Sequence, residues 1–292
     1  MDKYLQLIRP TQWVKNLFVL LPLFFGGRLL EVESLTQALV AFVAFCLVSS
    51  SIYCLNDICD VREDRLHPEK CKRPIASGAV PIAGGYALMV GLLLLSVLTV
   101  VLFGGTARWP MLGIILFYFV MNVGYCLKLK RVAIVDVFII AAGFVLRILI
   151  GGISTGIVLS QWIVLMTFLL SLFLAFAKRR DDVRIKQNTG AVTRKNVSRY
   201  NLPFLNQVLS IVGGITVVCY ILYCVSDEVT SRLGSHYVYL TSIFVLAGII
   251  RYLQLALVNE ETGNPVKILL KDHFIQLSIL GWIVSFALII YF

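Results

Sequence analysis

The sequence predicts an all-α fold, a polytopic membrane bundle of nine transmembrane helices. The chain has 292 residues, of which 59% are hydrophobic and only 14% are charged, whereas soluble domains average about 25% charged residues. A helix needs about 20 apolar residues to cross the roughly 30 Å hydrocarbon core of a bilayer. Nine apolar stretches meet this requirement, so we expect one integral membrane domain over residues 1–292.

The nine predicted spans follow one another along the chain, each resting on an apolar run. They are residues 14–31, 37–56, 80–104, 109–128, 132–151, 160–177, 205–225, 236–257 and 273–291. The first span is the least regular, because Lys15 shortens it and Pro22 and the Gly26–Gly27 pair interrupt it. Its ends are therefore the hardest to define from the sequence.

The distribution of basic residues orients these spans. With the N-terminus in the cytoplasm, 21 of the 26 Lys and Arg residues fall on the inner side, as the positive-inside rule requires. The net charge of +10 then reflects topology and attraction to anionic lipid headgroups, so we expect no nucleic-acid partner. No small-residue cleavage site follows the first apolar run, so we also expect no cleaved signal peptide.

The second span ends in an acidic stretch, NDICDVRED, at residues 56–64. On a helix that turns about 100° per residue, Asn56, Asp57, Asp60 and Asp64 lie within an arc of roughly 100°. Carboxylates at this spacing repel one another, so a cation is needed to offset them, and hard oxygen ligands suit Mg²⁺. A solvated helix end with surface ion pairs is the alternative interpretation.

A basic loop, RLHPEKCKRPIASG at residues 65–78, follows the acidic stretch directly. Carboxylates beside such a loop are suited to a Mg²⁺-bound diphosphate, because Lys70 and Arg73 can donate charge-assisted hydrogen bonds to phosphate oxygens. Ordinary positive-inside charge explains the number of cations but not their position. We expect His67 to form hydrogen bonds within the loop rather than to bind a metal.

Other polar residues stand at the inner ends of spans. Tyr125, Lys128 and Lys130, at the end of the fourth span, are candidates for substrate binding. Lysines there snorkel toward headgroups, but helix ends are also where phosphate donors are needed, so both interpretations stay open. Lys15, at the inner end of the first span, is a candidate for binding a lipid phosphate, with topology as the alternative.

One cation lies inside a span. Arg147 falls three quarters of the way along the fifth predicted helix, where a charged side chain is costly and is usually turned toward a cavity or a partner. We therefore predict a role in substrate binding, with a structural ion pair as the alternative. Asp136, near the start of the same helix, either joins the metal cluster or pairs with a lysine.

The motif NDxxDxxxD, followed by HPxKxxRPIxxG, resembles the UbiA superfamily of intramembrane prenyltransferases, which have nine transmembrane helices. More narrowly, the chain is similar to the branch that transfers phosphoribose to a polyprenyl phosphate. The stretches that carry this resemblance are IRPTQWVKN (8–16), YCLNDICDVREDRLHPEKCKRPIASG (53–78), YCLKLKRVAIVDVFIIAAGFVLRILIGG (125–152), SLFLAFAKRR (171–180), TGAVTRKNVSRY (189–200) and LKDHFIQL (270–277). They cover nearly the whole chain in order.

The resemblance adds residues at the end of the sixth span. Lys178, Arg179 and Asp182 match a basic motif of this branch and imply substrate binding, although Arg180 stands where an aromatic residue is usual. An arginine in place of an aromatic residue would change the shape of the substrate-binding pocket. In prenyltransferases a second aspartate-rich motif occupies the same connection, and Asp181 with Asp182 resembles its remnant.

The resemblance also implies a reaction. Its members take 5-phosphoribosyl diphosphate and a polyprenyl phosphate at the cytoplasmic face of the bacterial inner membrane. Catalysis by Asp57, Asp60, Asp64, Lys70 and Arg73 would then stabilise the leaving diphosphate, with Mg²⁺ as cofactor. The acceptor oxygen is already anionic, so no strong general base is required. This agrees with three histidines that form no obvious catalytic pair, and it argues against a Ser-His-Asp hydrolase.

Two other functions compete. An intramembrane prenyltransferase would bring an isoprenyl diphosphate to the same acidic motif and transfer its isoprenyl group to an aromatic or other small acceptor. A cation or phosphate transporter would also carry charges near its spans, but such sites lie near the membrane midplane on interrupted helices. Here the acidic residues crowd one end of a span, which disfavours transport.

Overall fold

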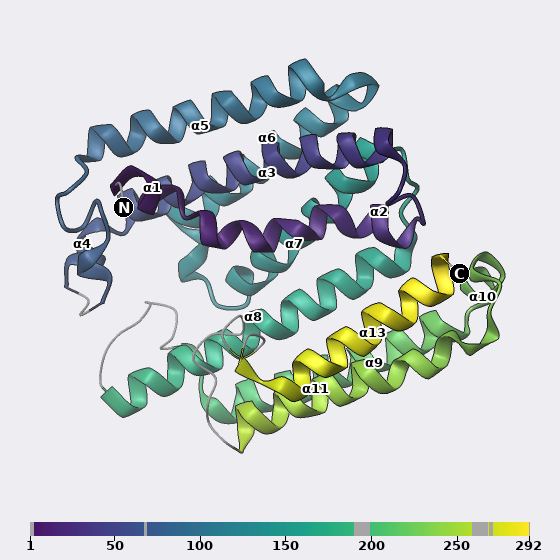
Figure 1. Cartoon of the computed structure of the whole chain (residues 1–292). Helices are drawn as coiled ribbons and strands as arrows, with labels where there is room; N and C mark the ends of the chain where they lie inside the picture. Colours follow the sequence, from purple (N-terminus) through teal and green to yellow (C-terminus); the bar gives the residue numbers. More distant parts are fainter. Residues whose placement is uncertain (1–2, 67–68, 190–198, 259–267, 269–270, 292) are drawn as a thin grey trace. The chain divides into compact units, whose positions relative to one another are not determined.

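The computed structural model describes residues 3–66, 69–189, 199–258, 268 and 271–291, the side chains of 188 and 189 excepted. In this part of the chain every regular element is helical (Figure 1), so the all-α prediction is confirmed. The chain forms two compact units, Met1–Ser160 and Gln161–Phe292, which are described separately below. The proposal of one functional domain over 1–292 stays a prediction.

Eight helices in the described residues are long and apolar enough to cross a membrane. They are α3 (Val32–Cys59), α5 (Ile82–Phe103), α6 (Arg108–Leu127), α7 (Val135–Thr155), α8 (Gln161–Thr189), α9 (Leu202–Val225), α11 (Ser242–Leu257) and α13 (His273–Tyr291). The short helices η3 (Gly105–Ala107) and η6 (His236–Thr241) extend α6 and α11. Eight of the nine predicted spans therefore match within a few residues at most ends; α8 continues well past its predicted end.

The first predicted span is not a continuous α-helix. It consists of a 3₁₀-helix, η1 (Pro10–Leu20), and a five-residue α-helix, α2 (Leu21–Phe25). Pro22 lies in the first turn of α2, and Gly26 caps its end. A 3₁₀-helix rises about 2 Å per residue, so η1 and α2 placed end to end reach about 30 Å, close to the hydrocarbon thickness. The count of nine is thus approximate.

The core of the first unit is built around α3, which packs against α5, α6 and α7. This helix is apolar on all faces and is the most buried span, as expected of a helix without a polar face. Hydrogen bonds join it to α5: the Ser51 hydroxyl donates to the Met89 carbonyl at 2.9 Å, and Ser96 donates to the Ala44 carbonyl at 2.7 Å. Small residues allow this close approach.

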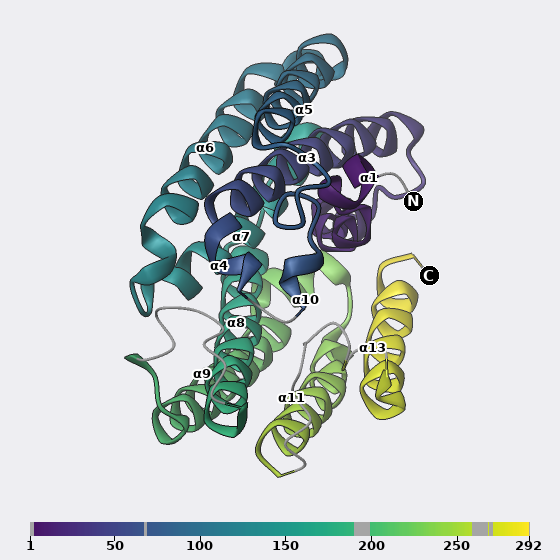
Figure 2. The ribbon, with the colours of Figure 1, turned by 90° about the vertical axis from the view of Figure 1, so that its left-hand side faces the viewer.

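The N-terminal segment is held against the same helix. The Trp13 indole donates to the Ser50 hydroxyl at 3.0 Å, and Ser50 donates to the Ile8 carbonyl at 2.9 Å. Between these contacts, Arg9 adopts a left-handed conformation with φ 55°, which turns the chain from α1 (Lys3–Ile8) into η1. In Figure 1, α1 and α4 (Val61–Arg65) lie at the same end of α3, the end that faces the viewer in Figure 2. The N-terminus is thereby brought to the acidic stretch.

Gly151 of α7 permits a close approach between α7 and η1. A Cβ atom at this position would lie 2.0 Å from the Val19 carbonyl oxygen, so Gly151→Ala forces the two backbones apart. We expect a loss of about 1–3 kcal/mol of stability, measured as a lower unfolding temperature in detergent. Gly91→Ala in α5 is the matched control, because nothing lies within 4 Å of its Cβ position, and its unfolding temperature should not fall. An equal effect in both variants would contradict this account.

The second unit is an assembly of long helices. α8 packs against α9, and α11 packs against α9 and α13. Hydrogen bonds join three of its elements. Trp282 of α13 donates to the Tyr220 hydroxyl of α9 at 2.6 Å, and that hydroxyl lies 2.7 Å from the Thr241 hydroxyl oxygen of η6. Arg251 of α11 forms an ion pair with Asp272 at 2.7 Å, which holds the start of α13 beside α11.

Candidate active site

The acidic stretch lies at the junction of two helices. Asn56 and Asp57 belong to the last turn of α3, Asp60 caps that helix, and Asp64 belongs to α4. The backbone hydrogen bonds continue across the junction, from the Asp60 amide to the Asn56 carbonyl at 3.0 Å and from the Asp64 amide to the Asp60 carbonyl at 2.8 Å. The near-continuous helix therefore keeps these side chains together, as the spacing predicts. We call Asp57, Asp60 and Asp64 the carboxylate cluster.

Two arginines reach the first and last members of the carboxylate cluster. Arg73 NH1 lies 3.1 Å from Asp57 Oδ1 and 2.7 Å from Asp64 Oδ2, so one guanidinium group bridges both carboxylates. Arg9 also forms an ion pair with Asp57 Oδ1, and its guanidinium lies over the Tyr53 ring. Burial raises the pKa of Asp64, and the adjacent Arg73 opposes this shift.

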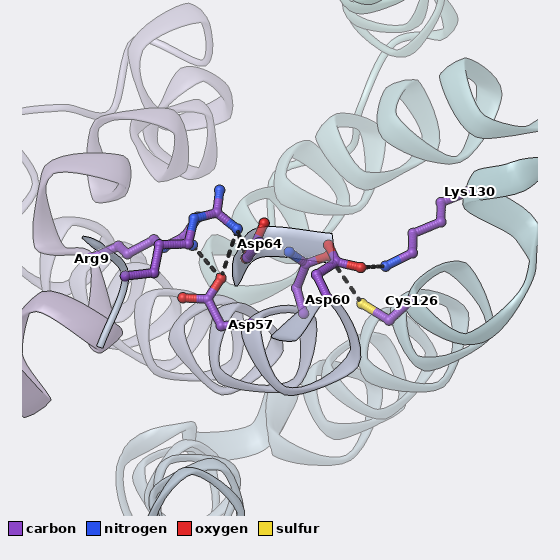
Figure 3. Close-up of polar contacts among 8 residues, drawn as sticks. Arg9, Asp57, Asp60, Asp64, Cys126 and Lys130 are labelled. Carbon is purple, nitrogen blue, oxygen red and sulfur yellow. Dashed lines mark hydrogen bonds and ion pairs between the residues drawn. The ribbon is translucent and has the colours of Figure 1, made fainter. Parts of the chain in front are cut away.

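Asp60 is paired separately. Its carboxylate forms an ion pair with Lys130 of η4 (Leu129–Arg131), whereas the Asn56 side-chain oxygen faces the Cys126 thiol at 3.8 Å. Figure 3 shows Arg9 and Lys130 approaching the acidic residues from opposite sides. Three carboxylates are thus interleaved with three cations, which balances the formal charge of the cluster.

The residues present are compatible with a bound divalent cation. Asp57 is only 2% exposed, and its Oδ2 atom is buried without a hydrogen-bond partner, an arrangement that costs free energy unless a cation or donor occupies that side. In the part of the chain that the structure describes, no three His, Cys, Asp or Glu side chains are already gathered as a metal site. The assignment of Asn56, Asp57, Asp60 and Asp64 as metal ligands stays a prediction.

Arg147 lies inside the first unit and is 5% exposed. Its Nε donates to the Asn16 side-chain oxygen at 2.8 Å, and NH1 donates to the Gly143 carbonyl at 2.7 Å. No carboxylate among the described residues lies within ion-pairing distance of its guanidinium. The alternative of a structural ion pair is therefore not what the structure shows.

The remaining candidates of the first unit are dispersed. Lys70 is half-buried in η2 (Lys70–Lys72), Lys128 is exposed where α6 ends, and Tyr125 is half-buried on α6. Asp136 is fully buried in the first turn of α7. His67 lies outside the described residues. The catalytic role predicted for Lys70 and the binding roles predicted for Tyr125 and Lys128 stay predictions.

The candidates of the second unit cluster on α8. Arg179 is fully buried and donates to Asp182 at 2.8 Å, while Lys178 is exposed. Arg180, which stands where the family usually has an aromatic residue, is buried and donates to the Asn206 side-chain oxygen of α9 at 2.7 Å. The departure is thus accommodated by a polar contact between two helices, and the substrate-binding role of these residues stays a prediction.

Comparison with known proteins identifies the family of the chain. A model of the UbiA prenyltransferase family matches residues 19–289. The chain belongs to this family. A solved structure of a UbiA homologue from Archaeoglobus fulgidus, bound to DMAPP and Mg²⁺, has the same fold, with a TM-score of 0.71, 20% identity and 99% of both chains covered. The expected UbiA-type fold and multi-pass membrane class are therefore confirmed.

Curated relatives within the family are more similar. This UbiA-family chain is 37% identical to the decaprenyl-phosphate phosphoribosyltransferase of Mycolicibacterium smegmatis, with 98% of this chain and 91% of that protein covered. It is 32% identical to the enzyme of the same name from Corynebacterium glutamicum, with coverages of 99% and 87%. The resemblance inferred from the motifs is thus confirmed by relatives that are transferases.

Sequence reasoning missed three features of the site. Arg9 is one of the positive-inside charges and stands in IRPTQWVKN, a stretch that carries the family resemblance, but nothing in the sequence indicates that it pairs with Asp57. For Lys130 the sequence leaves both snorkelling and phosphate binding open, and the structure pairs it with Asp60. Asn16, which orients Arg147, carried no distinguishing signal because an amide beside Lys15 is unremarkable in sequence. Each of these depends on contacts between distant segments.

Proposed function

We propose that this protein transfers 5-phosphoribose from 5-phosphoribosyl diphosphate to a polyprenyl phosphate and releases diphosphate. The reaction would take place at the cytoplasmic face of the bacterial inner membrane, the side on which the positive-inside rule puts the carboxylate cluster. The similarity to phosphoribosyltransferases over nearly the full chain supports this proposal. The observation that carries it is the bridge of Arg73 between Asp57 and Asp64, beside the unpartnered Asp57 Oδ2 atom.

This geometry provides the two kinds of group that a diphosphate leaving group needs. Mg²⁺ held by Asp57, Asp60 and Asp64, with Asn56, would neutralise the charge that develops on the diphosphate. Arg9, Arg73 and Lys130, which balance the carboxylates, are the nearest cations and can donate charge-assisted hydrogen bonds to phosphate oxygens. Lys70, in the adjacent loop, adds a further positive charge. The diphosphate of the donor is therefore bound by cations that the carboxylates already hold in position.

The bond changes require no strong base on the protein. The bond between C1 of the ribose and the diphosphate oxygen breaks, and the electron pair leaves with diphosphate. An anionic oxygen of the acceptor phosphate forms the new bond to C1, so no proton is removed. The chain's own groups bind and orient the two anions and exclude water from the sugar carbon.

A membrane location suits these two substrates. The acceptor's isoprenoid tail is insoluble in water, whereas 5-phosphoribosyl diphosphate is soluble. A site at the inner end of α3 allows each substrate to arrive from its own phase. Neither has to cross the bilayer.

The donor is tested directly with purified protein. The enzyme is incubated with polyprenyl phosphate, Mg²⁺ and either labelled 5-phosphoribosyl diphosphate or labelled geranyl diphosphate, and the lipid extract is counted. We expect label in the lipid only from the phosphosugar donor, and we expect EDTA to abolish it. Label from geranyl diphosphate alone, in the presence of an aromatic acceptor, would support the isoprenyl alternative instead.

A further inference from the structure

The first unit contains a buried cation that the carboxylate cluster does not neutralise. The guanidinium of Arg147 lies 4.7 Å from the centre of the Phe45 ring, 5.1 Å from Phe144 and 5.3 Å from Tyr118. These aromatic faces stabilise a positive charge in part. A charge buried in an apolar bundle is nevertheless costly unless an opposite charge compensates it. The aromatic surroundings therefore explain how the guanidinium is held but leave its charge unbalanced.

Arg147 also has N–H groups that make no short hydrogen bond with the described residues. A guanidinium has five N–H donors, and only Nε and one NH1 hydrogen make bonds shorter than 3 Å. NH2 reaches the Tyr118 hydroxyl at 3.4 Å and the Ser49 hydroxyl at 3.5 Å, which is at the long limit for such bonds. The outer edge of the guanidinium thus has donors that a stronger acceptor would use.

A second cation lies close to the first. Lys15 is within electrostatic range of both Arg147 and Arg9, and it makes no hydrogen bond or ion pair with the described residues. Its neighbour Asn16 is fixed on both sides, since its amide nitrogen donates to the Cys46 sulfur at 3.1 Å and its oxygen accepts from Arg147. Two positive charges are therefore within electrostatic range of each other, and no carboxylate of the described residues forms an ion pair with either.

We propose that Arg147, Lys15 and the Ser49 and Tyr118 hydroxyls form an internal anion subsite that binds a phosphomonoester. Arginine offers paired donors that match phosphate oxygens, and the two cations suit a dianion better than a monoanion. The subsite is separate from the carboxylate cluster, because Ser49 precedes Asp57 by about 12 Å along α3. Arg9 pairs with Asp57 and also interacts electrostatically with Lys15.

This inference rests on the proposed function for the identity of its ligand. Two phosphomonoesters take part in that reaction, the headgroup of the polyprenyl acceptor and the 5-phosphate of the sugar donor. Both present the same terminal phosphate to Arg147 and Lys15. The subsite therefore explains how the second phosphate of the reaction is bound while the diphosphate is held at the carboxylate cluster.

The test uses Arg147→Gln, Arg147→Lys and Lys15→Gln in lipid nanodiscs, with Arg108→Gln as the matched control. Arg108 is an exposed arginine of the same unit. Initial rates are measured while each substrate is varied in turn. We expect Arg147→Gln and Lys15→Gln to raise the KM for one substrate about tenfold or more, with Arg147→Lys intermediate and Arg108→Gln unchanged. A rise for polyprenyl phosphate assigns the subsite to the acceptor, and a rise for 5-phosphoribosyl diphosphate assigns it to the donor's 5-phosphate.

A binding measurement separates this inference from the proposed function. A compound that binds the folded protein raises its unfolding temperature by an amount that grows with the ratio of its concentration to its Kd, and this measurement requires no turnover. Loss of that rise in Lys15→Gln, whose side chain makes no hydrogen bond or ion pair with the described residues, supports the subsite even if wild-type protein transfers no phosphoribose. Unchanged KM values and an unchanged temperature rise for both compounds in Lys15→Gln and Arg147→Lys would overturn the subsite.

Discussion

Asp57→Asn is expected to lower kcat/KM for phosphoribosyl transfer by about 10³-fold or more, because it removes charge where the leaving group is stabilised. Asp57 is almost fully buried, it pairs with Arg9 and Arg73, and its second oxygen has no hydrogen-bond partner among the described residues. Asparagine keeps the shape but leaves two guanidinium groups without their shared counter-ion. The measurement is label transfer by purified enzyme over a range of Mg²⁺ concentrations.

Glu63→Gln is the matched control for Asp57→Asn. Glu63 is an exposed carboxylate of α4, seven residues before Lys70, and its removal should leave kcat/KM within about twofold. Folding of both variants is checked by their unfolding temperature in detergent. A folded Asp57→Asn enzyme with near-normal turnover would show that the carboxylate cluster does not bind the donor.

Arg73→Gln is expected to lower kcat/KM by about 10²-fold and to raise the KM for 5-phosphoribosyl diphosphate. Arg73 NH1 bridges Asp57 and Asp64 at 3.1 and 2.7 Å, so it both fixes these carboxylates and supplies a donor to the phosphates. Arg73→Lys should recover part of the activity, because a lysine keeps the charge but lacks the planar fork that spans two oxygens. Inhibition by the product diphosphate provides a second readout.

An exposed arginine of the same segment serves as the control for Arg73. Arg62→Gln removes an equal charge from α4 and should change neither the KM for the donor nor inhibition by diphosphate. If Arg73→Gln and Arg62→Gln behave alike, the effect is one of general surface charge. The bridge would then have no specific role in donor binding.

The spans were the most predictable part of this molecule. Long apolar runs have few alternatives to a membrane helix, so eight predicted spans correspond to the helices observed. The first predicted span differs because Pro22 and Gly26 favour short helices and because its 3₁₀ geometry covers more length per residue. The apolar pattern does not reveal that geometry.

The site was predictable only where its residues are neighbours in sequence. The spacing of Asp57, Asp60 and Asp64 on one helix follows from helical periodicity. Their cation partners are Arg9, just before η1, Arg73, just after η2, and Lys130 of η4, and these pairings depend on how distant segments pack. The left-handed conformation of Arg9 shows the difficulty, because a non-glycine residue in this region is rare and is fixed by surrounding contacts.

Arg147 illustrates the same limit for a buried charge. Its position inside a span predicted a functional role, and the sequence left open whether a carboxylate pairs with it. The structure instead surrounds it with Phe45, Tyr118 and Asn16, which come from three other helices. Only the fold distinguishes a neutralised arginine from one whose charge is left for a ligand.

The most direct test of the account is the mass of the lipid product. Purified enzyme is given polyprenyl phosphate, unlabelled 5-phosphoribosyl diphosphate and Mg²⁺, and the lipid fraction is analysed by mass spectrometry. We predict a new lipid whose mass equals that of the acceptor plus one phosphoribosyl group, formed together with diphosphate and absent when Mg²⁺ is chelated or Asp57 is replaced by Asn. An unchanged acceptor beside folded, Mg²⁺-supplied enzyme would contradict the account.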